Sequence, residues 1–119
     1  MDKFEIFEVP VFKSEFILTV KLGECNLPKL VMIHGYGSGS GLFYKMLKQL
    51  SEKFHIYMLD LLGMAGSSRP DFNSVAPKEC VDFFTDSIEE WRRWLGLDKF
   101  YLLGHSFGGY ISGLYAVKY

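Results

Sequence analysis

Residues 101–110, which read Tyr-Leu-Leu-Gly-His-Ser-Phe-Gly-Gly-Tyr, constrain the fold of this chain more than any other stretch. An apolar segment typical of a buried strand leads directly into Gly104-His105-Ser106-Phe107-Gly108, and a helical pattern follows at once. A serine on so tight a turn adopts a strained backbone, and the residues two positions before and after it must be small so that strand and helix approach closely. The sequence therefore predicts a sharp turn that exposes the Ser106 hydroxyl at the carboxyl end of a sheet.

Ser106 is the candidate nucleophile, because Gly-x-Ser-x-Gly between a strand and a helix is typical of a nucleophile elbow. The N–H of Phe107 would open the helix, where the helix dipole favours negative charge, so we expect it to stabilise an oxyanion. A second donor is expected from the loop His34-Gly35-Tyr36-Gly37. We assign it to the backbone N–H of Tyr36, with Gly37 as the alternative, and expect His34 to order the loop rather than act as a base.

The glycine-rich loop also allows a dinucleotide-binding unit as an alternative, since it lies between a strand and a helix and the next strand ends in Asp60. No frame starting at Gly35, Gly37 or Gly39 gives Gly-x-Gly-x-x-Gly, and no Gly-Lys-Ser/Thr follows. The sequence therefore argues against a nucleotide site. No cofactor and no metal are expected.

Strands and helices alternate along the chain in the order β-β-β-α-β-α-β-α. We expect strands at 5–9, 16–21, 29–33, 55–60 and 99–103, helices at 42–54, 77–96 and 107–119, and a loop at 61–73. This order predicts an α/β fold in which two antiparallel strands precede a parallel sheet. We place Pro10 in the break between the first two strands, and Trp91 and Trp94 in the core.

Composition excludes several classes of protein. The 119 residues hold one domain at most, and the net charge of −1, without a basic and aromatic run, gives no argument for nucleic acid. Cys25 and Cys80 have no metal-like spacing and are expected to be free thiols. The opening residues lack the apolar core of a signal peptide, and no window approaches 18 apolar residues. We expect a cytoplasmic protein, or one on the surface of membranes or lipid droplets.

The elbow and the glycine loop together resemble the α/β-hydrolase superfamily over essentially the whole chain, so that residues 1–119 correspond to the N-terminal portion of a single α/β-hydrolase domain. Residues 60–70, Asp-Leu-Leu-Gly-Met-Ala-Gly-Ser-Ser-Arg-Pro, are similar to the family's D-x-x-G-x-G-x-S loop. The second glycine comes at Gly66, whereas the family pattern has it at the position of Ala65. The resemblance implies that Asp60 braces this loop and is not a catalytic carboxylate.

Finer features are similar to the α/β-hydrolase domain-containing four and five subfamily, namely residues 60–70, Ser-Ile-Glu-Glu-Trp-Arg at 87–92, and residues 103–110. That subfamily includes lysophospholipase and N-acyl phospholipid hydrolases, lysophosphatidate acyltransferases, and a lipase coactivator that has lost its serine. Because Ser106 is present, the resemblance implies a serine hydrolase or acyltransferase acting on lysophospholipid or related acyl esters. The alternative is a non-catalytic lipid-surface or lipase-coactivator module, or a truncated pseudoenzyme.

A serine nucleophile needs a histidine base and a carboxylate, which follow the serine in this fold. Residues 107–119 contain no Asp, Glu or His, and neither His55 nor His105 is placed to serve as the base. We therefore expect these residues to be the N-terminal part of a longer hydrolase that lacks its C-terminal half, with the last strand left at an open edge. The 119 residues alone are predicted to be inactive.

Overall fold

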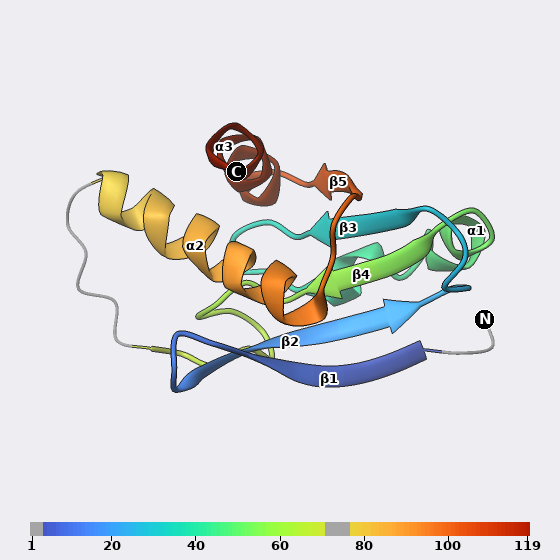
Figure 1. Ribbon diagram of the computed structural model, residues 1–119, viewed down its shortest axis with the longest axis horizontal. Helices are drawn as coiled ribbons and strands as arrows, with labels where there is room; N and C mark the ends of the chain where they lie inside the picture. The colour runs from blue at the N-terminus through green and yellow to red at the C-terminus, as the bar shows by residue number, and fades with distance from the viewer. Residues whose placement is uncertain (1–3, 71–76) are drawn as a thin grey trace.

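The computed structural model describes residues 4–70 and 77–119, in which five strands form one mixed sheet (Figure 1). The sheet order is β1-β2-β4-β3-β5, which brings the strand before Ser106 to one edge. The strands are β1 (Phe4–Val11), β2 (Glu15–Leu22), β3 (Lys29–Ile33), β4 (His55–Leu59) and β5 (Tyr101–Gly104). The helices are η1 (Ser40–Phe43), α1 (Leu47–Ser51), α2 (Pro77–Leu95) and α3 (Phe107–Lys118).

Strand pairing confirms the predicted architecture. β1 pairs with β2, and β2 with β4, in antiparallel register, whereas β3 runs parallel to both β4 and β5. Because parallel strands end at the same edge of a sheet, the loops after β3, β4 and β5 all emerge together. The loop of His34, the loop of Asp60 and the turn of Ser106 are those three loops.

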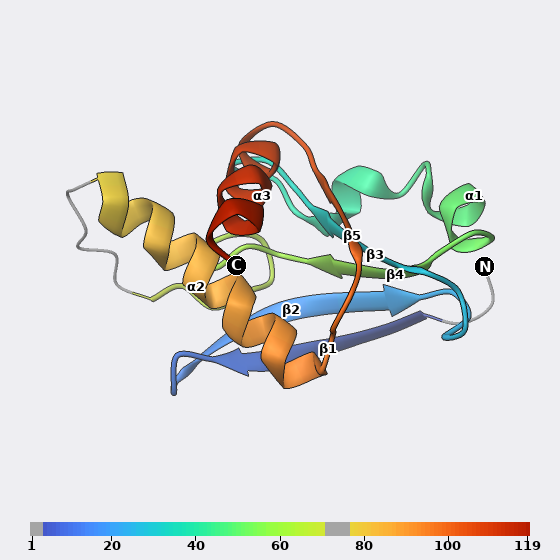
Figure 2. The ribbon, with the colours of Figure 1, turned by 45° about the horizontal axis from the view of Figure 1, so that its top comes forward.

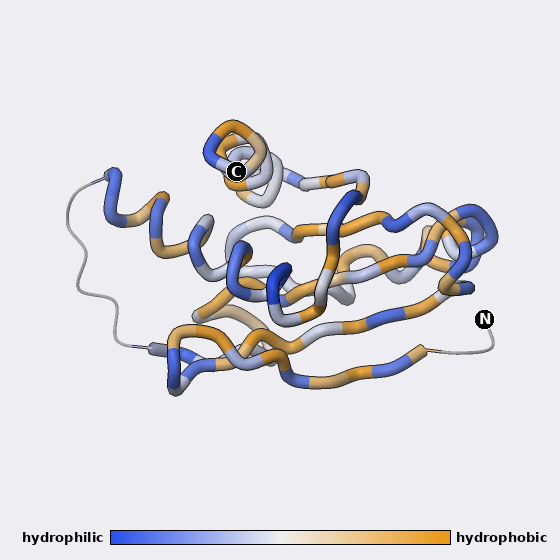
Figure 3. The backbone as a smooth tube through the Cα atoms, viewed as in Figure 1, coloured by the Kyte–Doolittle hydropathy of each residue, from blue (hydrophilic) through white to orange (hydrophobic). Residues whose placement is uncertain are grey.

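The helices cover both faces of the sheet, with α2 and α3 on one face and η1 and α1 on the other (Figure 2). Two apolar cores result, and burying their side chains is the main stabilising term of the fold. The larger core surrounds Trp91 of α2, which is fully buried and donates its indole N–H to the hydroxyl of Thr19 at 2.9 Å. Hydrophobic and hydrophilic residues alternate along α2, as expected for an amphipathic helix (Figure 3). Cys25 and Cys80 are free thiols, as predicted.

The predicted helix at 42–54 is wrong in its extent. Residues 40–43 form one 3-10 turn, and a short α-helix begins only at Leu47. Neither helix start has a side-chain cap, and the segment is instead anchored through the N–H of Ser40, which donates to the Asp60 carboxylate at 2.8 Å. Phe43 and Leu47 are nevertheless buried, so the apolar spacing identified the residues that face the sheet.

Two further predictions fail. Pro10 lies inside β1, opposite Phe16, and does not interrupt it, because β1 is an edge strand on which a missing N–H is tolerated. The chain reverses at residues 12–14 instead, where Phe12 and Lys13 have φ values of 49° and 65°. Trp94 is 55% exposed, since three residues of helix rotate it by about 60° away from buried Trp91.

The remaining boundaries agree closely. α2 begins at Pro77, as predicted, and ends at Leu95, one residue earlier than expected, while β5 begins two residues later than expected. Residues 61–70 form no helix or strand, in agreement with the expected loop, and 71–73 lie outside the described residues.

Candidate active site at the turn between β5 and α3

Ser106 occupies a strained turn. β5 ends at Gly104, α3 begins at Phe107, and Ser106 between them has φ 58° and ψ −120°. Such a conformation costs an L-residue on the order of 1–3 kcal/mol and persists only where the surrounding structure enforces it. Its carbonyl accepts hydrogen bonds from Gly109 and Tyr110 at 2.9 and 3.1 Å, which fix the backbone, while the residue itself is exposed. The turn thus presents the Ser106 side chain at the carboxyl edge of the sheet.

The flanking glycines are required by packing. A Cβ at Gly104 would lie less than 3.0 Å from the backbone of Gly108, and a Cβ at Gly108 less than 3.0 Å from the carbonyl oxygens of Ile33 and His34. These backbone atoms have no rotamer through which they could move away. The expectation that both positions must lack a side chain is therefore confirmed.

His34 orders the loop after β3. Its ring is fully buried, the N–H of Leu61 donates to Nε2 at 2.9 Å, and Nδ1 lies 2.7 Å from the carbonyl oxygen of Gly35. Because Nε2 accepts, Nδ1 donates, so the ring bridges two loops. This arrangement confirms the structural role predicted for His34.

The same loop lies against the serine turn. A Cβ built on Gly35 would be 3.2 Å from Cβ of Ser106, and the rings of Tyr36 and Phe107 meet edge to face with centroids 6.3 Å apart. Phe107 is the first residue of α3, so its N–H has no acceptor within the helix. The structure therefore brings Tyr36, Ser106 and Phe107 together from two distant parts of the chain.

Asp60 braces the loop after β4, as the resemblance implied. Its carboxylate accepts from the N–H of Ser40 at 2.8 Å and from the N–H of Gly66 at 3.1 Å, and its carbonyl accepts from the Ser67 hydroxyl. A Cβ at Gly66 would overlap the Leu18 side chain, whereas Ala65 adopts the left-handed φ of 46°. The glycine at 66 thus leaves room for the Leu18 side chain, while the left-handed residue of this loop is Ala65.

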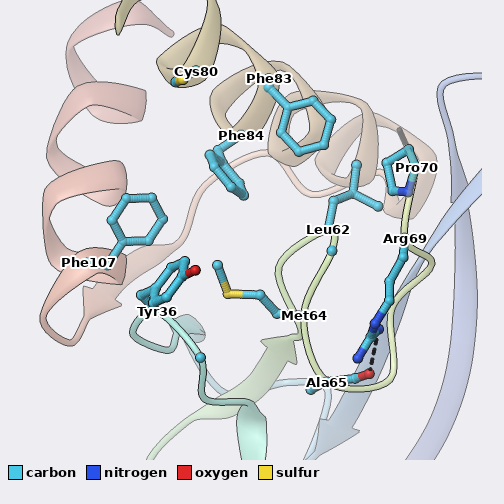
Figure 4. A pocket seen from close by; sticks show the side chains of 12 residues that line it. Tyr36, Leu62, Met64, Ala65, Arg69, Pro70, Cys80, Phe83, Phe84 and Phe107 are labelled. Atoms are coloured by element: carbon cyan, nitrogen blue, oxygen red, sulfur yellow. Dashed lines mark hydrogen bonds between the residues drawn. The ribbon is translucent and has the colours of Figure 1, made fainter. Parts of the chain in front are cut away.

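A cavity of about 710 Å³ opens beside these loops. Its lining comes from the Tyr36 loop, the loop after β4, the first turns of α2, and Phe107 (Figure 4). The lining residues are Tyr36, Gly37, Leu62, Gly63, Met64, Ala65, Arg69, Pro70, Cys80, Phe83, Phe84 and Phe107. Arg69 is the one charged residue among them. A cavity with this lining is suited to an apolar ligand that carries a polar group.

The described residues do not place a histidine base beside Ser106. His55 is the first residue of β4, so it lies at the amino ends of the parallel strands, whereas Ser106 lies at their carboxyl ends. Burial, with a smaller effect from Lys21 and Lys29, lowers the pKa of His55. His105 is exposed on the turn itself, and no hydrogen bond joins it to Ser106 in the described structure.

Within residues 4–70 and 77–119 no cluster of three potential metal ligands occurs. In the same part of the chain, no helix combines the length and apolar character needed to cross a bilayer.

Glu89 has a role that the sequence did not reveal. It is buried on α2, accepts a two-pronged ion pair from Arg92 at 2.8 Å, and accepts the Tyr115 hydroxyl of α3 at 2.7 Å. The Arg92 hydrogen bonds are the largest effect that lowers the Glu89 pKa, to about 2, while burial raises the pKa of Tyr115. Glu89 thereby joins α2 to α3, the helix that follows Ser106. Its spacing on α2 resembles that of the other polar residues, so only the contact with Tyr115 distinguishes it.

Comparison with known proteins agrees with this geometry. The probable 1-acylglycerol-3-phosphate O-acyltransferase of Oryza sativa subsp. japonica is 47% identical over 108 residues, which are 90% of this chain and 26% of that protein. The 1-acylglycerol-3-phosphate O-acyltransferase ABHD5 of Homo sapiens is 47% identical over 94 residues, 79% of this chain and 27% of that protein. The chain thus spans about a quarter of the length of these relatives. The expected similarity to the domain-containing four and five proteins is confirmed.

Solved structures share the fold. A membrane phospholipase A, described as a bacterial virulence factor, superimposes with a TM-score of 0.86 at 28% identity, over 98% of this chain and 36% of that one. A haloalkane dehalogenase from Bradyrhizobium elkanii reaches the same TM-score at 17% identity, which shows the fold alone. A family model for the alpha/beta hydrolase fold matches residues 28–119, from the strand before the His34 loop to the helix after Ser106. The chain therefore belongs to the α/β-hydrolase fold family.

Proposed function

We propose that the full-length protein transfers or hydrolyses acyl groups of lipid esters, with Ser106 as the nucleophile. The observation that carries the proposal is the strained, exposed position of Ser106 directly before Phe107, which lines an apolar cavity. Strained backbone conformations cluster at active sites, and the cavity beside this turn suits an acyl chain.

In the proposed reaction, Ser106 Oγ attacks the ester carbonyl while a histidine takes its proton. The tetrahedral intermediate carries its negative charge on the former carbonyl oxygen, which the N–H groups of Phe107 and Tyr36 stabilise, with Gly37 as the alternative to Tyr36. Collapse breaks the ester bond, protonates the leaving alcohol, and leaves the acyl group on Ser106. Water or a lipid hydroxyl then accepts it. We place the histidine and its carboxylate in the full-length protein outside these 119 residues, which alone would be inactive.

The names of the relatives support a lipid substrate, since the rice relative is called a probable 1-acylglycerol-3-phosphate O-acyltransferase and the human one a 1-acylglycerol-3-phosphate O-acyltransferase. The largely apolar cavity lining supports the same class of substrate. We propose that the protein works in the cytoplasm at a membrane or lipid-droplet surface, where such substrates reside. The reaction needs no cofactor.

The test is turnover of 1-acylglycerol-3-phosphate by the full-length protein, with a phospholipid or an acyl thioester as acyl donor. Ser106→Ala should lower the rate about a thousandfold or more, as expected when a nucleophile is removed. Ser112→Ala is the matched control, because the Ser112 hydroxyl is buried on α3 with no hydrogen-bond partner in the described structure. Turnover that persists in Ser106→Ala would contradict the proposal. A wild-type protein that binds lipid without any turnover would favour the alternative, a non-catalytic coactivator or lipid-surface module.

A further inference from the structure

Arg69 stands apart from the rest of the cavity wall. Among the described residues that line the cavity it alone is charged, and its side chain is exposed, so the guanidinium lies where the cavity meets solvent. Figure 4 shows it on the side of the cavity opposite Phe107, with Met64 between them. The apolar wall and the single cation thus occupy different ends of one cavity.

The guanidinium is held in place by the loop that it belongs to. Its Nη1 donates to the carbonyl oxygens of Ala65 and Ser67 at 3.0 and 3.1 Å. Both N–H groups of Nη1 are therefore used, while the Nε and Nη2 groups remain for a ligand. These two form the fork that binds two oxygens of a phosphate or carboxylate side by side.

The positive charge of Arg69 has no ion-pair partner among the described residues. The salt bridges of the described structure join lysines and the arginines of α2 to carboxylates, and none of them involves this loop. A fixed, unpaired guanidinium beside apolar surface attracts an anion that is attached to an apolar group.

We propose that Arg69 binds the phosphate group of a lysophosphatidate-type lipid whose acyl chain lies in the cavity, an inference that rests on the proposed function. The acyl chain then lies along the apolar wall near Phe107 and Met64, and the phosphate faces the Nε and Nη2 fork at the other end of the cavity. Arg69 is thus a specificity-determining residue that separates phosphate-bearing lipids from neutral glycerides.

The experiment measures binding and not turnover, so that it stays informative if the proposed chemistry fails. Full-length protein with Ser106→Ala binds a fluorescent fatty-acyl probe, which is displaced by 1-acylglycerol-3-phosphate or by the monoacylglycerol with the same chain. Adding Arg69→Gln should weaken binding of the phosphate lipid about tenfold, as expected for a charged hydrogen-bonded pair, and change monoacylglycerol binding less than about twofold. Arg69→Lys, which keeps the charge but lacks the fork, should fall between. Lys53→Gln removes one exposed charge remote from the cavity and is the matched control.

Other outcomes overturn the inference. If Arg69→Gln weakens both lipids equally, Arg69 only braces the loop. If it changes neither, or if the probe does not bind, the phosphate lies elsewhere or the cavity is no lipid site. Glycerol 3-phosphate without an acyl chain should displace the probe far more weakly than the lipid does, and equal displacement would identify a site for free phosphate esters. Failure of the proposed function itself is read separately, from turnover that persists in Ser106→Ala.

Discussion

Replacing Gly108 with alanine should destabilise the protein and disturb Ser106, because Gly108 is where α3 crosses the loop after β3. The new Cβ would lie less than 3.0 Å from the carbonyl oxygens of Ile33 and His34, so α3 or β3 must shift. Overpacking of this kind costs about 1–3 kcal/mol, and the upper part of that range applies because the opposing atoms are backbone. We expect a loss of about 3 kcal/mol in the free energy of unfolding.

Gly113 of the same helix gives the matched control. A Cβ there would meet nothing within 4 Å, and the position is exposed. Alanine favours the helix over glycine by about 0.5–1 kcal/mol, so Gly113→Ala should stabilise the protein slightly.

Urea denaturation of the full-length protein and its two variants measures both effects. The midpoint should fall for Gly108→Ala and stay level or rise for Gly113→Ala. Reaction of Ser106 with an acylating probe should slow only in Gly108→Ala, since that change moves the turn. Equal stability of the two variants would refute the close approach of α3 to β3, and with it the packing argument for the serine turn.

The hydrogen bond and burial of Trp91 predict a loss of about 2 kcal/mol for Trp91→Phe, whereas Trp94→Phe, at a 55% exposed position, should stay within about 0.5 kcal/mol. Equal losses in urea denaturation would contradict the assignment of Trp91 alone to the core. Folding lowers the Glu89 pKa from 4.5 to about 2, so its contribution is present above pH 4.5 and is lost as the pH falls toward 2. The stability difference between wild type and Glu89→Gln should therefore be on the order of 2 kcal/mol at pH 7 and shrink between pH 4.5 and 2. A difference independent of pH would show that the ion pair with Arg92 does not hold.

Sequence patterns predicted those parts of the fold in which local and long-range preferences agree. The segment 29–33 is uniformly apolar apart from its first residue, as a strand covered on both faces must be, and β3 has these bounds. The serine turn was predictable because its glycines, its strand and its helix are all adjacent in sequence. The parallel pairing of the later strands was predictable from the alternation of strands and helices.

Features that depend on distant contacts could not be predicted from local patterns. The segment before α1 begins as a 3-10 turn at Ser40, whose N–H is anchored on Asp60, 20 residues later in the sequence. The tolerance of Pro10 follows from the position of β1 at an edge, which only the strand order reveals. The pairing of Glu89 with Tyr115 joins two helices across 26 residues and leaves no periodic signal.

The candidate site shows the same division. Ser106, Phe107 and the Tyr36 loop were predictable from motifs, and the structure places them side by side. The cavity was not, because its wall combines side chains from four segments of the chain. Arg69 gains its distinct position only from the loop fold that ties Nη1 to two carbonyls.

Covalent labelling by a fluorophosphonate tests the central claim most directly, because the reagent reacts with an activated serine and not with an ordinary hydroxyl. In the full-length protein, we expect one adduct on the peptide that contains Ser106, none in Ser106→Ala, and protection by the acyl-lipid substrate. A folded wild-type protein that binds lipid but stays unlabelled, or that is labelled at another serine, would contradict the assignment of Ser106 as the nucleophile.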